Sequence, residues 1–148
     1  MSYSIKDIED AIIKALMPLT RERGGDVITL DSHSGDLERA LASGKSPDVI
    51  PPALLVTFLG SKFNQAKAPM LERGMTFSLL HASLSLESEK SRRRIAYGMM
   101  ESTRALLNNN DLGLAITPLT IEEEMLVGSS GEMTVYRALY RTSFADED

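Results

Sequence analysis

The segment from residue 91 to residue 144 constrains the fold of this chain more than any other. Its first part, residues 91–110, carries apolar side chains at the spacing of about 3.6 residues that an amphipathic helix requires. Charged and amide side chains fall on the opposite side of this helix. The apolar stripe consists of Ile95, Met99 and Leu106, with Ala96, Met100 and Leu107 beside it. The segment therefore begins with a long helix that packs one face against the rest of the protein.

Two strands follow this helix. The Asn- and Gly-rich residues 108–113 tolerate left-handed backbone and end the helix, and Pro118 prevents it from resuming. Residues 120–127 and 132–144 read as strands, with Gly-Ser-Ser-Gly as the turn between them. A helix followed by a β-hairpin is a scaffold, and no catalytic motif lies within it.

The first helix also has clear start and stop signals. Ser4 and Asp7 form an S-x-x-D cap, and Pro18 disfavours continuation, so we expect a helix over residues 5–17. The elements expected between the two long helices are a strand at 27–30, a short helix at 37–41 capped by Ser34 or Asp36, a buried strand at 53–60 and a central strand at 75–87. Residues 60–74 show no clear period and are expected to form a long connection.

Together these elements predict a single α+β domain over residues 1–148. We expect a mixed or antiparallel sheet of about five strands, with two long helices and one short helix packed on one face. The other face of the sheet would be partly exposed, which is how such a domain usually offers an interface. Residues 145–148, three of which are acidic, are expected to form a disordered tail.

The composition narrows the function classes. The 148 residues carry a net charge of -5 at pH 7, whereas a general nucleic-acid binder usually shows a basic excess. No apolar run approaches the ~20 residues that cross a bilayer, and the N-terminal segment lacks the apolar core of a secretory signal. The chain contains no cysteine, which removes disulfides and thiolate chemistry. We therefore expect a protein made in the cytoplasm, with no cofactor, no metal, no membrane partner and no sequence-specific nucleic-acid partner.

The residues that could carry chemistry are few and scattered. His33 lies in a polar turn and His81 within a strand, and neither has a second metal ligand at a suitable spacing. Glu122 and Glu124 face one side of their strand and Glu123 the other, which suits a charged edge strand better than a metal site. No phosphate-binding loop or nucleophile motif occurs. The pattern indicates binding or assembly rather than catalysis.

The order of these packing and turn features resembles the Gp37 family of tail proteins from Mu-like phages and prophages. The segments that carry the resemblance are residues 8–16, 24–27, 51–60 and 92–120, together with the final strand pattern EMTVYRALYRTSF. The resemblance implies a structural protein of a long phage tail, located in the virion. The size and element order are also similar to those of tail terminators. Such proteins form a hexameric ring that caps the tail tube, ends its polymerisation and offers a docking surface to the head or neck.

The resemblance supplies no catalytic residues, so the candidate site residues are contacts with other protein subunits. They are Lys62, Phe63, Lys67 and Arg73 in the expected connection, Arg92, Arg93 and Arg94 at the start of the long helix, and Arg137 and Arg141 on the last strand. Three arginines near a helix N-terminus oppose the helix dipole and favour a partner, although a solvent-facing flank balanced by Glu87 and Glu89 stays open as an alternative. The expected partners are further copies of the chain in a ring of six, tail tube and sheath proteins, and a head-completion or neck protein.

Three alternatives stay open at this point. Another neck or tail-completion component, such as a head–tail connector, could use the same scaffold. A small enzyme could assemble a site between subunits from His33, His81 and Asp36. A regulatory module could use the face that carries Tyr136 and Tyr140 for a ligand, in which case a defined apolar pocket is expected.

Overall fold

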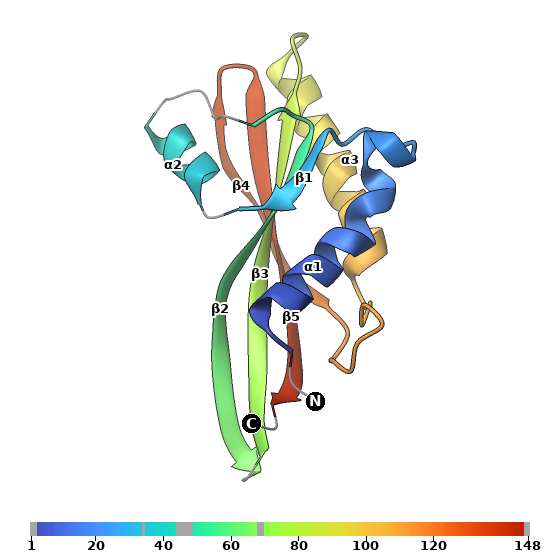
Figure 1. The fold of residues 1–148 in the computed structure, drawn as a ribbon. Helices are drawn as coiled ribbons and strands as arrows, with labels where there is room; N and C mark the ends of the chain where they lie inside the picture. The colour runs from blue at the N-terminus through green and yellow to red at the C-terminus, as the bar shows by residue number, and fades with distance from the viewer. Residues whose placement is uncertain (1–2, 34, 44–48, 68–69, 147–148) are drawn as a thin grey trace.

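One sheet runs the full height of the molecule (Figure 1). The computed structural model describes residues 3–33, 35–43, 49–67 and 70–146, and within these ranges the sheet has five strands in the order β1-β2-β3-β5-β4. The strands are β1 (Thr29–Ser32), β2 (Ala53–Lys67), β3 (Met70–Leu84), β4 (Thr120–Ser130) and β5 (Met133–Asp146). β1 and β2 are parallel, and all other neighbours are antiparallel. The expected α+β domain with a mixed sheet is confirmed.

The helices cover both faces of this sheet rather than one. The described helices are α1 (Ile5–Leu16), α2 (Asp36–Ala42), α3 (Glu89–Leu107) and the 3-10 turns η1 (Met17–Leu19) and η2 (Arg21–Arg23). α1 and α3 lie on one face and α2 on the other (Figure 1). Leu37 of α2 packs with Leu55 and Leu80, whereas Leu54 and Leu79 belong to the core under α1 and α3. Side chains alternate between the faces of a strand, so the expectation of one helical face was wrong for α2.

α1 begins and ends where its sequence signals predict. The Ser4 hydroxyl accepts a hydrogen bond from the Asp7 amide at 3.1 Å, and the Asp7 carboxylate accepts one from the Ser4 amide at 2.9 Å. This reciprocal cap satisfies two donors that the first helical turn otherwise leaves unpaired. The α-helix ends at Leu16, and Pro18 lies in the following η1 turn.

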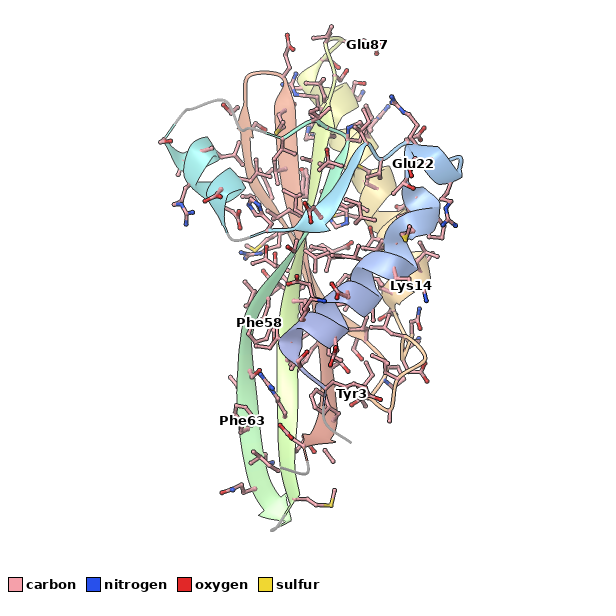
Figure 2. The ribbon with its side chains drawn as sticks, in the orientation of Figure 1. Tyr3, Lys14, Glu22, Phe58, Phe63 and Glu87 are labelled. Atoms are coloured by element: carbon pink, nitrogen blue, oxygen red, sulfur yellow. The ribbon has the colours of Figure 1, made fainter. Side chains whose placement is uncertain are left out.

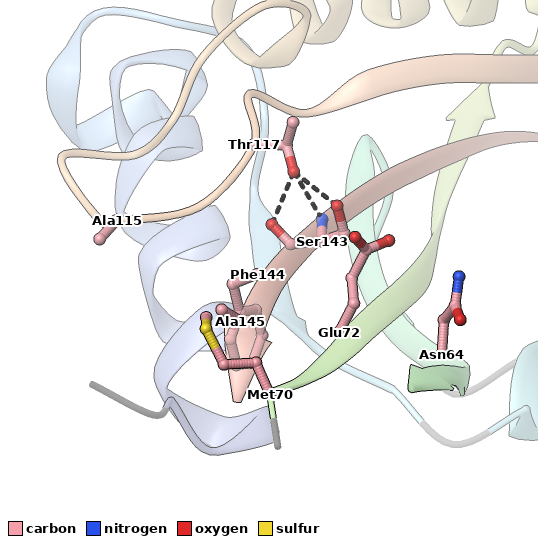
Figure 3. Close-up of a pocket in the computed structure, with 8 residues that line it drawn as sticks. All are labelled: Asn64, Met70, Glu72, Ala115, Thr117, Ser143, Phe144 and Ala145. Atoms are coloured by element: carbon pink, nitrogen blue, oxygen red, sulfur yellow. Dashed lines mark hydrogen bonds between the residues drawn. The ribbon is translucent and has the colours of Figure 1, made fainter. Parts of the chain in front are cut away.

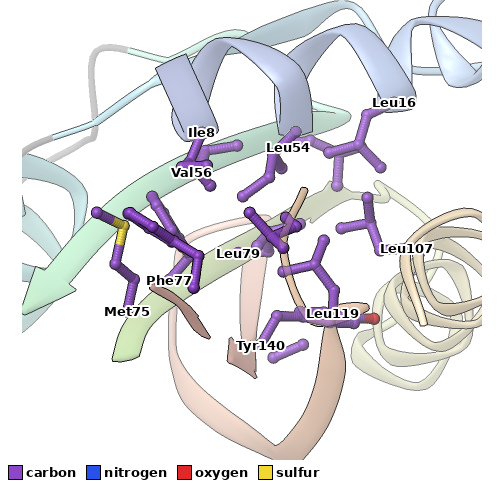
Figure 4. Packing of buried hydrophobic residues seen from close by; sticks show 14 of the residues in the cluster. Ile8, Leu16, Leu54, Val56, Met75, Phe77, Leu79, Leu107, Leu119 and Tyr140 are labelled. Carbon is purple, nitrogen blue, oxygen red and sulfur yellow. The ribbon is translucent and has the colours of Figure 1, made fainter. Parts of the chain in front are cut away.

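The main core lies between the sheet and the helices α1 and α3. It combines fully buried side chains from both helices, from three strands and from the segment before β4 (Figure 4). Its fully buried members include Ile8, Ile12, Leu16, Leu54, Val56, Phe77, Leu79, Leu107, Leu119 and Tyr140. Full burial of one such aliphatic side chain is worth about 1.5–3 kcal/mol, so this part of the molecule holds most of the stabilising apolar contact. We call the helix-covered part of the sheet the body.

Residues 60–74 depart most from expectation. They form no long connection: β2 continues to Lys67, β3 starts at Met70, and pairs such as Phe63 with Arg73 join the two strands. We call residues 59–67 and 70–74 the arm, which extends beyond the body with the end of β5 beside it (Figure 1). The expected loop was wrong because an arm that is exposed on both faces has no apolar alternation for sequence reasoning to detect.

The ends of several elements also differ from those expected from the sequence. β4 runs on to Ser130, so the turn before β5 is shorter than the expected four residues and contains Gly131, whose φ of +60° favours glycine. Ala145 and Asp146, assigned to a tail from the sequence, are the last residues of β5 and pair with β3. Residues 147 and 148 lie outside the described residues, as does Ser34, one of the two expected caps of α2. The other expected cap, Asp36, was wrong: it is the first residue of the helix, and Gly35 occupies the N-cap position without a side-chain hydrogen bond.

Candidate assembly surfaces

The arm exposes an aromatic ring that is held in place by its own neighbours. Phe63 is 54% exposed and lies on the arm, beyond the helices (Figure 2). The Arg73 guanidinium carbon lies 5.2 Å from the centroid of this ring, and Arg73 Nε donates to Ser61 Oγ at 3.0 Å. The contact orders both side chains without burying them. The sequence thus names Phe63 and Arg73 as surface residues and misses that they face each other across a strand pair.

The outer edge of β2 is open below β1. Within the described residues β1 pairs with β2 only from Ala53 to Val56, and the His33 amide donates to the Val56 carbonyl at 2.8 Å. In the described part of the chain, no main-chain hydrogen bond reaches the outer edge of residues 57–63. Unpaired amide and carbonyl groups along a strand form a template for pairing with another strand. The sequence reasoning missed this edge because it ended the strand at Gly60.

β4 forms the opposite edge of the sheet and, among the described residues, pairs only with β5. The Ile121 amide donates to Asn108 Oδ1 at 3.0 Å, so the open part of this edge begins at Glu122. Three exposed glutamates, residues 122–124, are followed by Met125 and Leu126, which are 40% and 54% exposed. The edge position expected for the glutamates is therefore found, and exposed apolar side chains lie directly beside them.

The structure brings two of the candidate cations together on the sheet face below α2. Lys62 of the arm and Arg141 of β5 line one groove of about 320 Å³, together with Thr76 and Glu122. Arg137 lies on the same face, where its Nη2 is 2.8 Å from the sulfur of Met125. In the described part of the chain no helix covers this lower region, so these charges are available to another protein chain.

A second groove lies where the arm joins the body (Figure 3). Its volume is about 490 Å³, and both strands of the arm, the end of β5 and the loop before β4 line it. Thr117 fixes that loop to β5: its amide donates to the Ser143 carbonyl at 2.8 Å, and its hydroxyl lies 2.6 Å from the Ser143 hydroxyl. The Tyr3 hydroxyl accepts from the Ala115 amide at 2.9 Å and holds the far side of the same loop. The groove is therefore built on a fixed wall.

The three arginines at the start of α3 have three different environments. Arg92 reaches back to the body, donating to the Ser85 carbonyl at 3.2 Å and to Thr134 Oγ1 at 3.4 Å. Arg93 pairs with Glu89 one turn earlier at 2.8 Å. Arg94 is exposed and has no ion-pair partner among the described residues.

Two further candidates need separate mention. Lys67 is the last residue of β2 and pairs with Met70, and its side chain lies outside the described part of the structure. Tyr140 is fully buried in the main core, and Tyr136 packs edge-on against Tyr97 with ring centroids 5.5 Å apart. Both tyrosines thus have a packing role, and neither lines the two grooves described above.

The two histidines are not brought together. His81 is fully buried under α3, where its Nε2 lies 2.9 Å from the Thr103 hydroxyl, and burial lowers the pKa of His81 to about 4. His33 contacts the start of α2, on the other face of the sheet, where its Nε2 accepts from the Leu37 amide at 2.9 Å. Among the described residues, no three acidic or histidine side chains converge in a way that could hold a metal ion.

Comparison with known families decides the family of the chain. The sequence matches the family described as Bacteriophage Mu, Gp37, over residues 4–145. The chain belongs to this family. It is therefore a phage structural protein, as the resemblance implied. No curated protein matches the chain. Within the described residues, no helix is both long enough and apolar enough to cross a membrane.

Proposed function

We propose that this member of the Bacteriophage Mu Gp37 family is a structural protein of the phage tail, and that it acts as the tail terminator. Copies of the chain form a ring, expected to be a hexamer, on the end of the tail tube. One face of the ring binds the tube and ends its polymerisation, and the other face docks the head or neck. The protein is made in the host cytoplasm and retained in the virion tail.

The observation that carries this proposal is the arm. Its longer strand spans nine residues, which at the strand rise of ~3.3 Å per residue extends roughly 30 Å. Phe63 and Met70, which are 54% and 45% exposed, lie along it. A folded chain gains nothing in its own core from such side chains, whereas a ring subunit uses them to contact the tube or a neighbouring copy.

Tail length in phage that lacks the protein tests the terminator role. Loss of a terminator leaves tails of variable length that carry no heads. Loss of a neck or tail-completion component, the alternative with the same scaffold, leaves tails of uniform length that fail to join heads. Electron microscopy of lysates separates these outcomes, and tails of uniform length would reject termination.

Complementation then tests whether the exposed side chains of the arm are needed to set tail length. A gene encoding Phe63→Ala and Met70→Ala is expected to fail to restore tail length. Lys14→Glu, a change at an exposed position on α1, is the matched control and is expected to restore it (Figure 2). Full restoration by the arm variant would show that neither the tube nor a neighbouring copy needs these two side chains.

A further inference from the structure

We propose that copies of this chain join edge to edge: the open edge of β2 in one copy pairs antiparallel with the open edge of β4 in the next copy. The pairing makes one continuous sheet through the assembly. The inference rests on the ring of the proposed function and names the interface that closes it. Because the two edges are different surfaces, the contact is heterologous, which is the kind that generates rings.

The two edges have opposite charge. The open part of the β2 edge, residues 57–63, contains Lys62 and no acidic residue, and Lys67 follows at the end of the strand. β4 contains three consecutive glutamates, residues 122–124, and no basic residue. A β4 edge placed against another β4 edge would oppose glutamate to glutamate, and two β2 edges would oppose lysine to lysine. The charges therefore favour β2 against β4 and disfavour pairing of either edge with itself.

One register fits the chemistry on both faces of the sheet. When Lys62 lies opposite Glu123, both side chains are on the uncovered face, because their partners Gly74 and Leu139 lie on that face. In the same register Ser61 lies opposite Glu124 on the α1 face. The Arg73 guanidinium, already bound to Ser61 Oγ, then meets that glutamate.

Exposed apolar side chains meet in this register as well. Leu59, which is 50% exposed, comes opposite Leu126, which is 54% exposed, and Gly60 comes opposite Met125, which is 40% exposed. In a parallel alignment the order of features reverses, and Leu59 would lie against the glutamates while Lys62 would lie against the apolar pair. The antiparallel direction is the one that matches charge with charge and apolar surface with apolar surface.

The topology of the sheet independently favours antiparallel pairing of β2 with the β4 of a neighbouring copy. Within one copy β2 and β4 run antiparallel to each other, because three antiparallel steps separate them in the sheet. Rotation about an axis to which the strands are tilted, as in a closed barrel, keeps strand direction, so a ring built this way places β2 antiparallel to the β4 of its neighbour. The register also offsets neighbouring copies along the strand, since Glu123 is level with Thr57 in its own sheet and with Lys62 in the joined one. A sheet that closes on itself needs such a stagger.

Cross-linking tests this pairing directly, because the natural chain has no cysteine. In one copy, Ser61 and Glu124 lie on opposite edges, at least three strand spacings or about 14 Å apart. A thiol-reactive cross-linker shorter than that gap can join the double variant Ser61→Cys/Glu124→Cys only between copies. We expect a ladder of covalent species up to the size of the closed ring. Each single-cysteine variant is expected to give no covalent species larger than one chain, and a mixture of the two to give covalent dimers and nothing larger.

Charge exchange tests the residue pair. Lys62→Glu and Glu123→Lys are each expected to lower assembly at least tenfold when measured alone by light scattering. Mixing the two variant proteins restores complementary edges at every contact and is expected to recover assembly, as is the double variant in one chain. Lys14→Glu, on the solvent side of α1, is the charge-matched control and is expected to have no effect.

At the highest soluble concentration the cross-linker traps even weakly populated pairs of copies. Absence of the ladder therefore overturns edge pairing, even if the protein is mostly monomeric by light scattering. A ring that persists in Lys62→Glu and gives no ladder contradicts this interface and leaves the proposed function standing. A ladder from a protein whose loss does not change tail length supports the interface and rejects termination.

Discussion

The body and the arm are built from the same strands, yet their side chains have opposite environments. In the body Leu54, Val56 and Leu79 are fully buried between the helices and the sheet. In the arm Leu59 and Phe63 of β2 are at least half exposed. The strands therefore continue into the arm because neighbouring strands satisfy their hydrogen bonds, not because a core surrounds them. A region that adds little stability and exposes apolar surface is expected to serve contacts with other chains.

The largest expected effect contrasts one residue type in the two regions. Leu79→Ala in the body removes a fully buried side chain and is expected to cost about 2–5 kcal/mol of unfolding free energy. Leu59→Ala in the arm, where the side chain is 50% exposed, is expected to stay within about 0.5 kcal/mol of the wild type. Urea unfolding followed by circular dichroism measures both. Equal losses would mean that the arm belongs to the cooperative core.

The next effect is a pH dependence of folding stability that arises from His81 in the body. Burial holds the pKa of His81 at about 4, against 6.5 for the exposed side chain. Between these two values the unfolded chain binds a proton that the folded chain excludes, so stability falls as the pH is lowered from 6.5 to 4. The loss amounts to about 3 kcal/mol at pH 4.

Unfolding at a series of pH values measures this loss. His81→Asn is expected to flatten the dependence over this range, and His33→Asn, the control in the turn before α2, to leave it in place. An unchanged slope in the His81 variant would show that other groups cause it.

A smaller effect separates the arginines at the start of α3. Arg92→Ala removes hydrogen bonds to Ser85 and Thr134 and is expected to cost about 1 kcal/mol of unfolding free energy. Arg94→Ala is expected to change it by less than about 0.5 kcal/mol, because no ion pair is lost. Thermal unfolding of the two variants checks the order, and a reversed order would mean that Arg92 is the residue available to a partner.

The last comparison tests the arm itself, where the expected effect on folding is again small. Phe63→Ala removes an exposed ring and its contact with Arg73 and is expected to change unfolding free energy by at most about 1 kcal/mol. The same variant is expected to reduce assembly, as measured by light scattering over a concentration series. Normal assembly would indicate that the exposed ring has no partner.

Elements with a buried face could be read from the sequence, and elements without one could not. α1 was found from Ser4 and Pro18, and β5 from its run of apolar and β-branched residues, because capping and burial leave local signals. For the arm around Phe63 the sequence predicts a loop, because its strands are held by main-chain hydrogen bonds that any sequence can make. The side of the sheet that α2 covers was also missed, because only Leu37 of this seven-residue helix is buried.

The assembly surfaces could likewise be predicted only in part. The sequence points to charged residues but does not reveal their neighbours. Lys62 and Arg141 come together only through strand pairing, and Arg92 differs from Arg94 only through its contacts in the folded body. The glutamates of β4 were recognised as an edge, yet their counterpart on β2 required the position of the arm. Surfaces made by pairing distant strands are therefore visible in the fold and not in the sequence.

Amide hydrogen exchange tests most directly whether the open edges, rather than the body, make the assembly. The wild-type protein is compared at low concentration and in its assembled form. We expect protection to appear in residues 57–63 and 122–126, while exchange in the body stays unchanged. Assembly that leaves both edges unprotected and protects another surface would contradict the central claim.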